Sequence, residues 1–238
     1  MENTERQNYT FKQKVENFLY HYKFQTIAVC FVLFVVVWVI ITSIGKGNED
    51  VYLGYIGEYA YSNSEADALG ERMSDLLELD VDGDGKDNIR FNRYHYYSAD
   101  QIKQLTESAK ERNEDVGYYP VLNEKNYQYF TTEFENGNTA VWFVSKEVYA
   151  MMDKSSLMTV EDALGYIPER GTVDKYAIDC ATLYFGVDAF GSVAHNTYLI
   201  IRGNRVHSFI QGEEQSRTEL ENSLELYRAI VEYKSKKS

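Results

Sequence analysis

Residues 51–60, with the sequence VYLGYIGEYA, combine β-branched and aromatic side chains and end in turn-forming residues. This composition predicts a buried β-strand. The following segment, SNSEADALGERMSDLLEL (62–79), spaces its apolar residues as one face of a helix does, and Ser62 or Ser64 can cap its first turn. A buried strand followed by an amphipathic helix is the first half of an α/β unit.

The same alternation continues along the chain. NIRFNRYHYY (88–97) has strand character again, and SADQIKQLTESAKERNED (98–115) predicts a second helix that begins with a capping box of Ser98 and Gln101. Strands that alternate with helices imply crossover connections and therefore parallel pairing. We expect an α/β domain with a mostly parallel sheet that is covered by helices.

A second run of elements follows the same order. The segment 123–138 predicts a helix, 139–145 a buried strand and 146–154 a short helix. The last expected element is a helix that begins at a capping box of Ser216 and Glu219. The chain has only two prolines, so we expect these elements to form one domain with its own core.

Residues 25–44, QTIAVCFVLFVVVWVIITSI, contain no charged side chain. A helix rises about 1.5 Å per residue, so about 20 such residues cross the roughly 30 Å hydrocarbon core of a bilayer. We therefore expect a transmembrane helix. A cleaved signal peptide would have a shorter apolar core and a small-x-small cleavage site, and a lipoprotein signal ending at Cys30 would have a small residue in place of Val29.

The charged residues beside this segment predict its orientation. Lys12, Lys14 and Lys23 precede the apolar run, and basic flanks stay in the cytoplasm. The sequence therefore predicts a single-pass protein of the cell membrane, with a cytoplasmic segment at 1–24 and an extracellular domain at 45–238.

The charge and the cysteines exclude some partners and bonds. The chain has a net charge of −13 at pH 7, and residues 1–44 contribute +1, so residues 45–238 carry −14. Such an acidic domain argues against a nucleic acid or an anionic membrane surface as its partner. Cys30 lies in the predicted membrane span and Cys180 in the domain, so no intrachain disulfide is expected.

The stretch FENGNTAVWFVSKEVYAMMDKSSLMTVEDAL (134–164) resembles the extracellular solute-binding proteins of bacterial ABC importers, in which a helix and a turn lead into a hydrophobic strand and a short helix. In pattern, the resemblance covers residues 50–165. YKFQTIAVCFVLF (22–34) is similar to the membrane anchors of uncharacterised Firmicutes surface proteins. The resemblance implies a periplasmic-binding-protein-like domain that presents a solute to a transporter. The chain departs from that family in its short domain and in having a membrane helix instead of a lipidated cysteine.

In α/β sheets, ligands bind beyond the carboxyl ends of the strands, where successive loops converge. Tyrosine suits sugars, peptides and other polar solutes, because it combines a flat apolar face with a hydroxyl that donates and accepts. The chain has 21 tyrosines, so many of them must serve packing instead. The candidate ligand-binding residues, which follow the predicted strands, are Glu58, Tyr59, Tyr61, Tyr96, Tyr97, Ser145, Lys146 and Tyr149.

The segment LDVDGDGKDNIRF (79–91) resembles the first half of a calcium-binding loop, with Gly85 where such loops turn. Its twelfth position holds Phe91 instead of the bidentate carboxylate, so a weakly bound, structural Ca²⁺ is expected. The alternative is that aspartate and glycine simply form a tight turn between helix and strand. The candidate ligands are Asp80, Asp82, Asp84, Lys86 through its carbonyl, and Asn88.

These features predict a non-catalytic domain that binds a small polar solute, such as a sugar or a peptide, for a transporter or sensor in the same membrane. The alternative is an accessory or scaffold subunit that keeps the fold without the cleft, which the short domain favours. A remote alternative is a cysteine transpeptidase like the membrane-anchored sortases, with Cys180 as nucleophile and His95, His195 or His207 as base. The surrounding AIDCATLY lacks the Thr-Leu-x-Thr-Cys strand of that family, and a lone cysteine in an apolar segment is usually a small buried hydrophobe.

Overall fold

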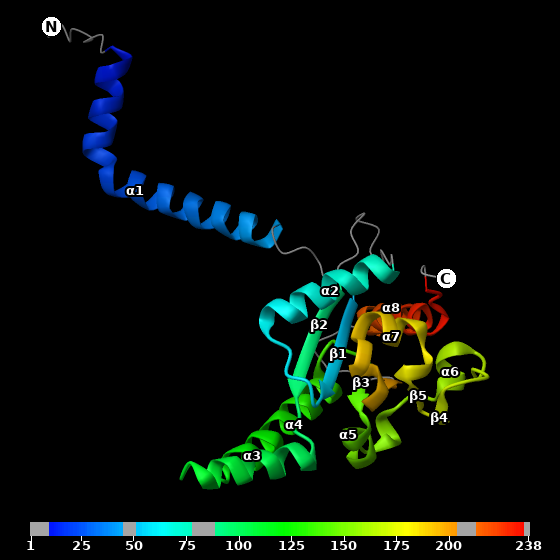
Figure 1. Cartoon of the computed structure of the whole chain (residues 1–238). Coiled ribbons are helices and arrows are strands. Elements are labelled where there is room, and N and C mark those ends of the chain that lie inside the picture. The colour runs from blue at the N-terminus through cyan, green and yellow to red at the C-terminus, as the bar shows by residue number, and fades with distance from the viewer. Residues whose placement is uncertain (1–9, 45–50, 78–88, 204–212, 236–238) are drawn as a thin grey trace, which may run out of the picture. The chain divides into compact units, whose positions relative to one another are not determined.

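The structure of this protein is a computed structural model (Figure 1). The residues that it describes are 10–44, 51–77, 89–203 and 213–235. The chain divides into two compact units, Met1–Asn48 and Glu49–Ser238.

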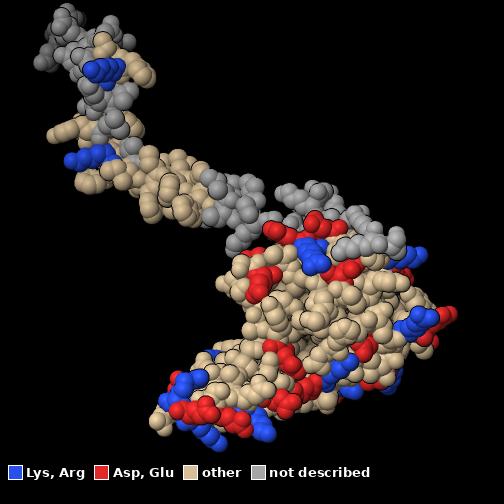
Figure 2. All heavy atoms as spheres, in the orientation of Figure 1, with Lys and Arg blue, Asp and Glu red and all other residues tan. Residues whose placement is uncertain are grey.

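The first unit contains one long helix, α1 (Phe11–Ile44), in which Tyr22 departs from helical backbone angles. The stretch Tyr20–Trp38 is long and apolar enough to cross a membrane. The described charged side chains of this helix, Lys12 and Lys23, lie in its first half (Figure 2). The apolar helix expected at residues 25–44 is therefore present within a longer helix, whose length and composition fit a membrane anchor and also a signal sequence.

The second unit is built on a six-stranded sheet with the strand order β2-β1-β3-β6-β5-β4. Strand β1 pairs in parallel with both β2 and β3, whereas β6, β5 and β4 extend the sheet by antiparallel pairing. The strands are β1 (Val51–Gly57), β2 (Ile89–His95), β3 (Val141–Ser145), β4 (Thr172–Asp174), β5 (Ala177–Asp179) and β6 (Thr197–Ile201).

The predicted α/β class is confirmed, but the sheet is mixed and not mostly parallel. A crossover helix, α2 (Asn63–Leu77), connects β1 to β2 and makes them parallel. Strands β4 and β5 are separated only by Lys175 and Tyr176, and so short a connection can join only antiparallel neighbours. The expectation of parallel pairing thus holds only where a helix long enough to cross the sheet separates the strands.

The helix starts follow from local hydrogen bonds. Ser98 and Gln101 form the predicted capping box at the start of α3. Ser62 caps α2 in the same way, because its hydroxyl accepts from the Glu65 N–H and its own N–H donates to the Glu65 carboxylate. The predicted capping box at Ser216 is wrong, because Ser216 lies inside α8 (Glu213–Glu232), three residues after that helix begins. The remaining helices are α3 (Ala99–Glu111), α4 (Tyr118–Asn136), α5 (Lys146–Met151), α6 (Val160–Leu164), α7 (Tyr184–Phe190) and α8 (Glu213–Glu232), with 3-10 turns η1 (Lys154–Ser156), η2 (Cys180–Thr182) and η3 (Gly191–Asn196).

The core lies on both faces of the sheet, because alternate residues of each strand point to opposite sides. Helices α2, α6, α7 and α8 cover one face, where Leu53 and Phe143 are buried. Helices α4 and α5 cover the other face, where Ile56 and Trp142 are buried. A Cβ at Gly54 would lie 2.2 Å from the Trp142 ring, so only glycine lets this indole pack against β1. This three-layer arrangement fixes the strand ends that carry the candidate site.

Helices α3 and α4 extend beyond the end of the sheet (Figure 1). Basic and acidic side chains alternate over the visible face of these helices, and neither sign dominates it (Figure 2). Charges mixed in this way are typical of a solvated surface. On the visible face of these helices, charges of both signs are therefore mixed.

Candidate functional site

A cavity of about 250 Å³ lies at the carboxyl ends of β1 and β3. After β1 the chain forms β2 on one side of that strand, and it later forms β3 on the other side. Strands β1 and β3 therefore flank the point where the strand order reverses. Ligands of open α/β sheets bind at such a switch point. The cavity is lined by Tyr55, Glu58, Tyr59, Gln101, Ser145, Ser192, Val193, Asn196 and Thr197.

Tyr55 forms the floor of the cavity at the end of β1. Its side chain is 1% exposed, and its hydroxyl accepts a hydrogen bond of 3.1 Å from the Tyr59 N–H. A Cβ at Gly57 would lie 2.5 Å from the Tyr55 hydroxyl oxygen, so glycine leaves the space that this hydroxyl occupies. Burial raises the pKa of Tyr55 to about 12, with a contribution from the Glu58 charge. The phenol is therefore neutral at pH 7 and can act as a hydrogen-bond donor.

Glu58 is held from three other elements. Its carboxylate accepts a bond of 2.7 Å from the Asn196 side chain, at the end of η3. Its carbonyl oxygen accepts from Nε2 of His95 at 3.1 Å and from the Gln101 amide at 3.5 Å. Burial lowers the pKa of His95, so this ring is neutral at pH 7. Glu58 therefore has a fixed position, which a specific binding site requires.

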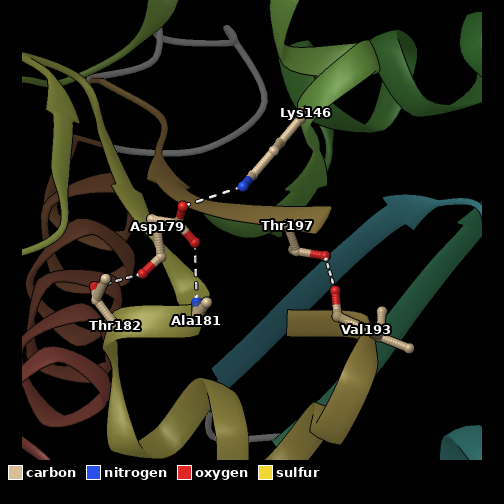
Figure 3. A network of polar contacts seen from close by, with 6 residues as sticks. All are labelled: Lys146, Asp179, Ala181, Thr182, Val193 and Thr197. Atoms are coloured by element: carbon tan, nitrogen blue, oxygen red, sulfur yellow. Dashed lines mark hydrogen bonds and ion pairs between the residues drawn. The ribbon is translucent and has the colours of Figure 1, made fainter. Parts of the chain in front are cut away.

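The hydroxyl groups on the other side of the cavity also have fixed roles. The Ser145 hydroxyl caps α5 by accepting from the Val148 N–H at 3.3 Å. The Thr197 hydroxyl donates to the Val193 carbonyl at 2.8 Å, as Figure 3 shows. Because the Thr197 proton is used within the protein, this oxygen can offer only lone pairs to a ligand.

Lys146 follows Ser145 directly but does not line the cavity. Its ammonium points to Asp179, at 3.1 Å (Figure 3). It also lies 5.1 Å from the centre of the Tyr198 ring. The carboxylate of Asp179 accepts a further bond from the Ala181 N–H at 3.0 Å. The charge of Lys146 is thus neutralised within the domain.

Tyr149 belongs to a separate polar cluster. Its hydroxyl donates to both oxygens of Asp174, at 2.7 and 2.8 Å. The ammonium of Lys154 lies 3.1 Å from Asp174 and 4.2 Å from the centre of the Tyr149 ring. Burial and the bond to Asp174 raise the pKa of Tyr149. These bonds link α5 to β4, and the polar groups of Tyr149, Lys154 and Asp174 pair with one another.

Three further tyrosines from the prediction pack against the protein. Tyr61 lies against the rings of Tyr55 and Phe91, with ring centres 5.1 and 5.5 Å apart. Tyr97 lies 4.0 Å from the His95 ring, and its backbone forms two bonds with the side chain of Asn123. Tyr96 contacts Tyr127 and the sulfur of Met151.

Of the eight candidate residues, the structure brings Glu58, Tyr59 and Ser145 together at the cavity. It places Lys146 and Tyr149 in internal contacts and the other three tyrosines in aromatic packing. The sequence-based prediction assigned Tyr55 to the core of the first strand and Gln101 to a capping box. Neither was therefore a candidate for the site, although both line the cavity. The same prediction also missed the residues just before β6 and the first residue of that strand, because candidates were sought only directly after predicted strands. The missed lining residues are Tyr55, Gln101, Ser192, Val193, Asn196 and Thr197.

The predicted calcium ligands lie outside the described residues, which omit 78–88. Calcium binding by this loop therefore stays a prediction. Among the residues that the structure does describe, no group of three or more His, Cys, Asp or Glu side chains could hold a metal ion. The ligands in question are Asp80, Asp82, Asp84, Lys86 and Asn88.

Cys180 lies in η2 and is fully buried. Burial raises the pKa of its thiol well above the usual value, and the neighbouring Asp179 adds to this effect. A buried, protonated thiol is a poor nucleophile in this conformation. The surroundings of Cys180 are those of a packing residue.

No protein-family model matches this chain, and no curated protein or solved structure was found to be similar. The resemblance of residues 134–164 to solute-binding proteins therefore rests on the sequence pattern alone.

Proposed function

We propose that residues 45–238 form an extracellular domain that captures a small polar solute without catalysis, and that the helix at 25–44 anchors the domain in the cell membrane. The observation that carries this proposal is the cavity at the carboxyl ends of β1 and β3. Typical ligand pockets have volumes of roughly 300–1,000 Å³. At about 250 Å³, this cavity lies just below that range and suits a small solute.

The composition of the cavity supports capture. Its lining combines a carboxylate, two amides and several hydroxyls with two tyrosines. Polar groups at fixed positions beside apolar surface orient a small ligand and distinguish it from others. Glu58 and Thr197 are fixed in this way by hydrogen bonds to other elements, so the site needs little rearrangement to bind.

The N-terminal helix supports presentation at a membrane. Lys12, Lys14 and Lys23 precede the apolar segment, so the amino terminus stays in the cytoplasm and the domain is outside. A domain tethered in this way reaches only neighbours in the same membrane. A transporter or a sensor of that membrane is the partner that such a domain would serve.

A second candidate function is that of a scaffold, and a different observation favours it. Tyr118, Val121 and Tyr129 on α4 are 57, 65 and 53% exposed. Their spacing of three and eight residues places them along one side of the helix. An exposed apolar stripe of this kind is suited to contact with another protein. In this alternative, the domain would hold a membrane neighbour through α4 and not through the cavity.

The test is native mass spectrometry of the full chain, purified in mild detergent from several growth media. Ser192→Trp fills the cavity from its rim, because Ser192 is exposed and lines it. His195→Trp is the matched control, because His195 is exposed in the same 3-10 turn without lining the cavity. We expect a bound small molecule on the wild type and on His195→Trp, and its loss from Ser192→Trp. Bare protein in every preparation would contradict solute capture and favour the scaffold, and a solute retained by Ser192→Trp would contradict the assignment of the site.

A further inference from the structure

We infer that the cavity selects a small molecule that carries a primary ammonium group, which Glu58 binds as its counter-ion. This inference rests on the proposed function and deepens it, because it separates an amine, an amino acid amide or a peptide amino terminus from a neutral sugar.

The lining of the cavity carries a negative charge. Among the described lining residues, Glu58 is the only one with a carboxylate, and none is Lys, Arg or His. Glu58 is half-buried, and its carboxylate accepts from the neutral Asn196 amide through a bond that is exposed to solvent. An opposite charge within hydrogen-bond distance stabilises a carboxylate more than a neutral donor does. The ligand is the natural source of that charge.

Two described cations near the ends of the sheet's parallel strands, Lys146 and Arg93, are engaged elsewhere. Lys146 is bound to Asp179 and lies over the Tyr198 ring (Figure 3). Arg93 donates from Nε to the Tyr61 carbonyl at 2.8 Å and from Nη2 to the side-chain oxygen of Asn63. Neither cation contacts Glu58, so the negative charge of the cavity is not compensated by these groups.

The cavity also offers lone pairs that a ligand N–H can use. An ammonium group has three N–H donors and no acceptor. Thr197 offers only lone pairs, since its proton goes to the Val193 carbonyl. The Ser145 oxygen keeps a second lone pair beside the one that caps α5. Glu58 and these two hydroxyl oxygens line the same cavity, and each can accept an N–H from a ligand.

Other ligand classes fit this lining less well. An anion would be repelled by Glu58, and a neutral sugar would leave the carboxylate without a counter-ion. A divalent cation such as Ca²⁺ takes six or more oxygen ligands, usually from several carboxylates. The cavity offers one carboxylate and adds Tyr59, whose ring can contact the carbon atoms next to an ammonium group.

The test uses the full chain in nanodiscs of phosphatidylcholine, which has no net charge to attract amines. Saturation-transfer-difference NMR is recorded with three amines and their neutral hydroxyl counterparts: ethanolamine with ethylene glycol, glycinamide with glycolamide, and putrescine with 1,4-butanediol. We expect saturable binding of at least one amine and weaker or no binding of its counterpart. Glu58→Gln should weaken amine binding at least tenfold, which corresponds to about 1.4 kcal/mol. Glu161→Gln, which changes an exposed carboxylate outside the cavity, should leave binding unchanged.

Three results would overturn the inference. These are hydroxyl compounds that bind as tightly as the amines, amines that bind Glu58→Gln as tightly as the wild type, and no binding by any amine of the set. Native mass spectrometry separates these failures from failure of the proposed function. A neutral solute that co-purifies and is lost from Ser192→Trp would leave solute capture intact, whereas bare protein in all preparations would remove both proposals.

Discussion

Gly57→Ala tests the geometry of the cavity floor. The new Cβ would lie 2.5 Å from the Tyr55 hydroxyl oxygen, 2.9 Å from Cζ of the same ring and 3.3 Å from Cβ of Ser145. Tyr55 is fully buried and cannot swing into solvent, so the change overpacks the core. Overpacking of this kind lowers the free energy of unfolding by about 1–3 kcal/mol. For a domain of roughly 150–250 residues, a loss of about 2 kcal/mol lowers Tm by about 4–8 °C.

The second change in this experiment is Tyr55→Phe, which removes the oxygen that the new Cβ would meet. On its own it removes the bond from the Tyr59 N–H and costs about 0.5–1.5 kcal/mol. In the double variant the main clash is gone, and the ring can shift to relieve the contact at Cζ. We therefore expect the double variant to be at least about 1 kcal/mol more stable than the sum of the two single effects predicts.

Urea unfolding of the full chain, followed by the fluorescence of the buried Trp142, measures these free energies. Gly117→Ala is the control, because its Cβ would meet only the Asp115 carboxylate, at 3.3 Å, and the backbone angles of Gly117 are ones that alanine adopts. It should change stability little. If the effects of Gly57→Ala and Tyr55→Phe add within about 0.5 kcal/mol, the close approach of Gly57 to the hydroxyl is not what constrains this site.

Three further predictions concern single residues. In the folded Cys30→Ser variant, Cys180 should resist iodoacetamide at neutral pH, because burial raises the pKa of its thiol. It should react once urea unfolds the protein. Rapid labelling of the folded protein would revive the transpeptidase hypothesis. Tyr149→Phe should lower the free energy of unfolding by about 1 kcal/mol, since it removes the bonds to the partly exposed Asp174, and should leave any co-purifying solute in place; loss of that solute would contradict the separation of this cluster from the cavity. Because burial raises the pKa of Tyr55 from 10.0 to about 12, its contribution to stability is full below about pH 10 and is lost as the pH rises toward 12. The stability gap between the wild type and Tyr55→Phe should therefore shrink above pH 10 in urea unfolding, and a gap that stays constant would contradict this pKa.

Local sequence signals predicted the local structure well. Residues 51–60 contain β1, residues 139–145 contain β3, and the capping box at Ser98 is present. These elements depend on composition and on bonds between residues three apart in sequence, which a single sequence displays. The class of the fold followed from their order. The parallel half of the sheet was predictable for the same reason, because α2 has the length that a crossover requires.

The candidate site depends on contacts between distant residues, and the sequence alone gives little sign of them. Glu58 and Asn196 are bonded across 138 positions, and no spacing rule relates them. Tyrosines that look alike in sequence have different roles, since Tyr59 lines the cavity and Tyr149 is tied to Asp174. Only the packing around each ring distinguishes these roles.

The departure from a parallel sheet is also what completes the cavity. Residues that precede a strand parallel to β3 would lie at the opposite edge of the sheet, where β3 begins. Because β6 runs antiparallel to β3, Thr197 pairs with Ser145, and η3 comes to the edge where β1 and β3 end. Asn196 can therefore reach Glu58, and Thr197 can offer its lone pairs beside Ser145. An all-parallel version of this domain would have the same β1 and β3, but it would lack the side of the cavity that holds the carboxylate in place.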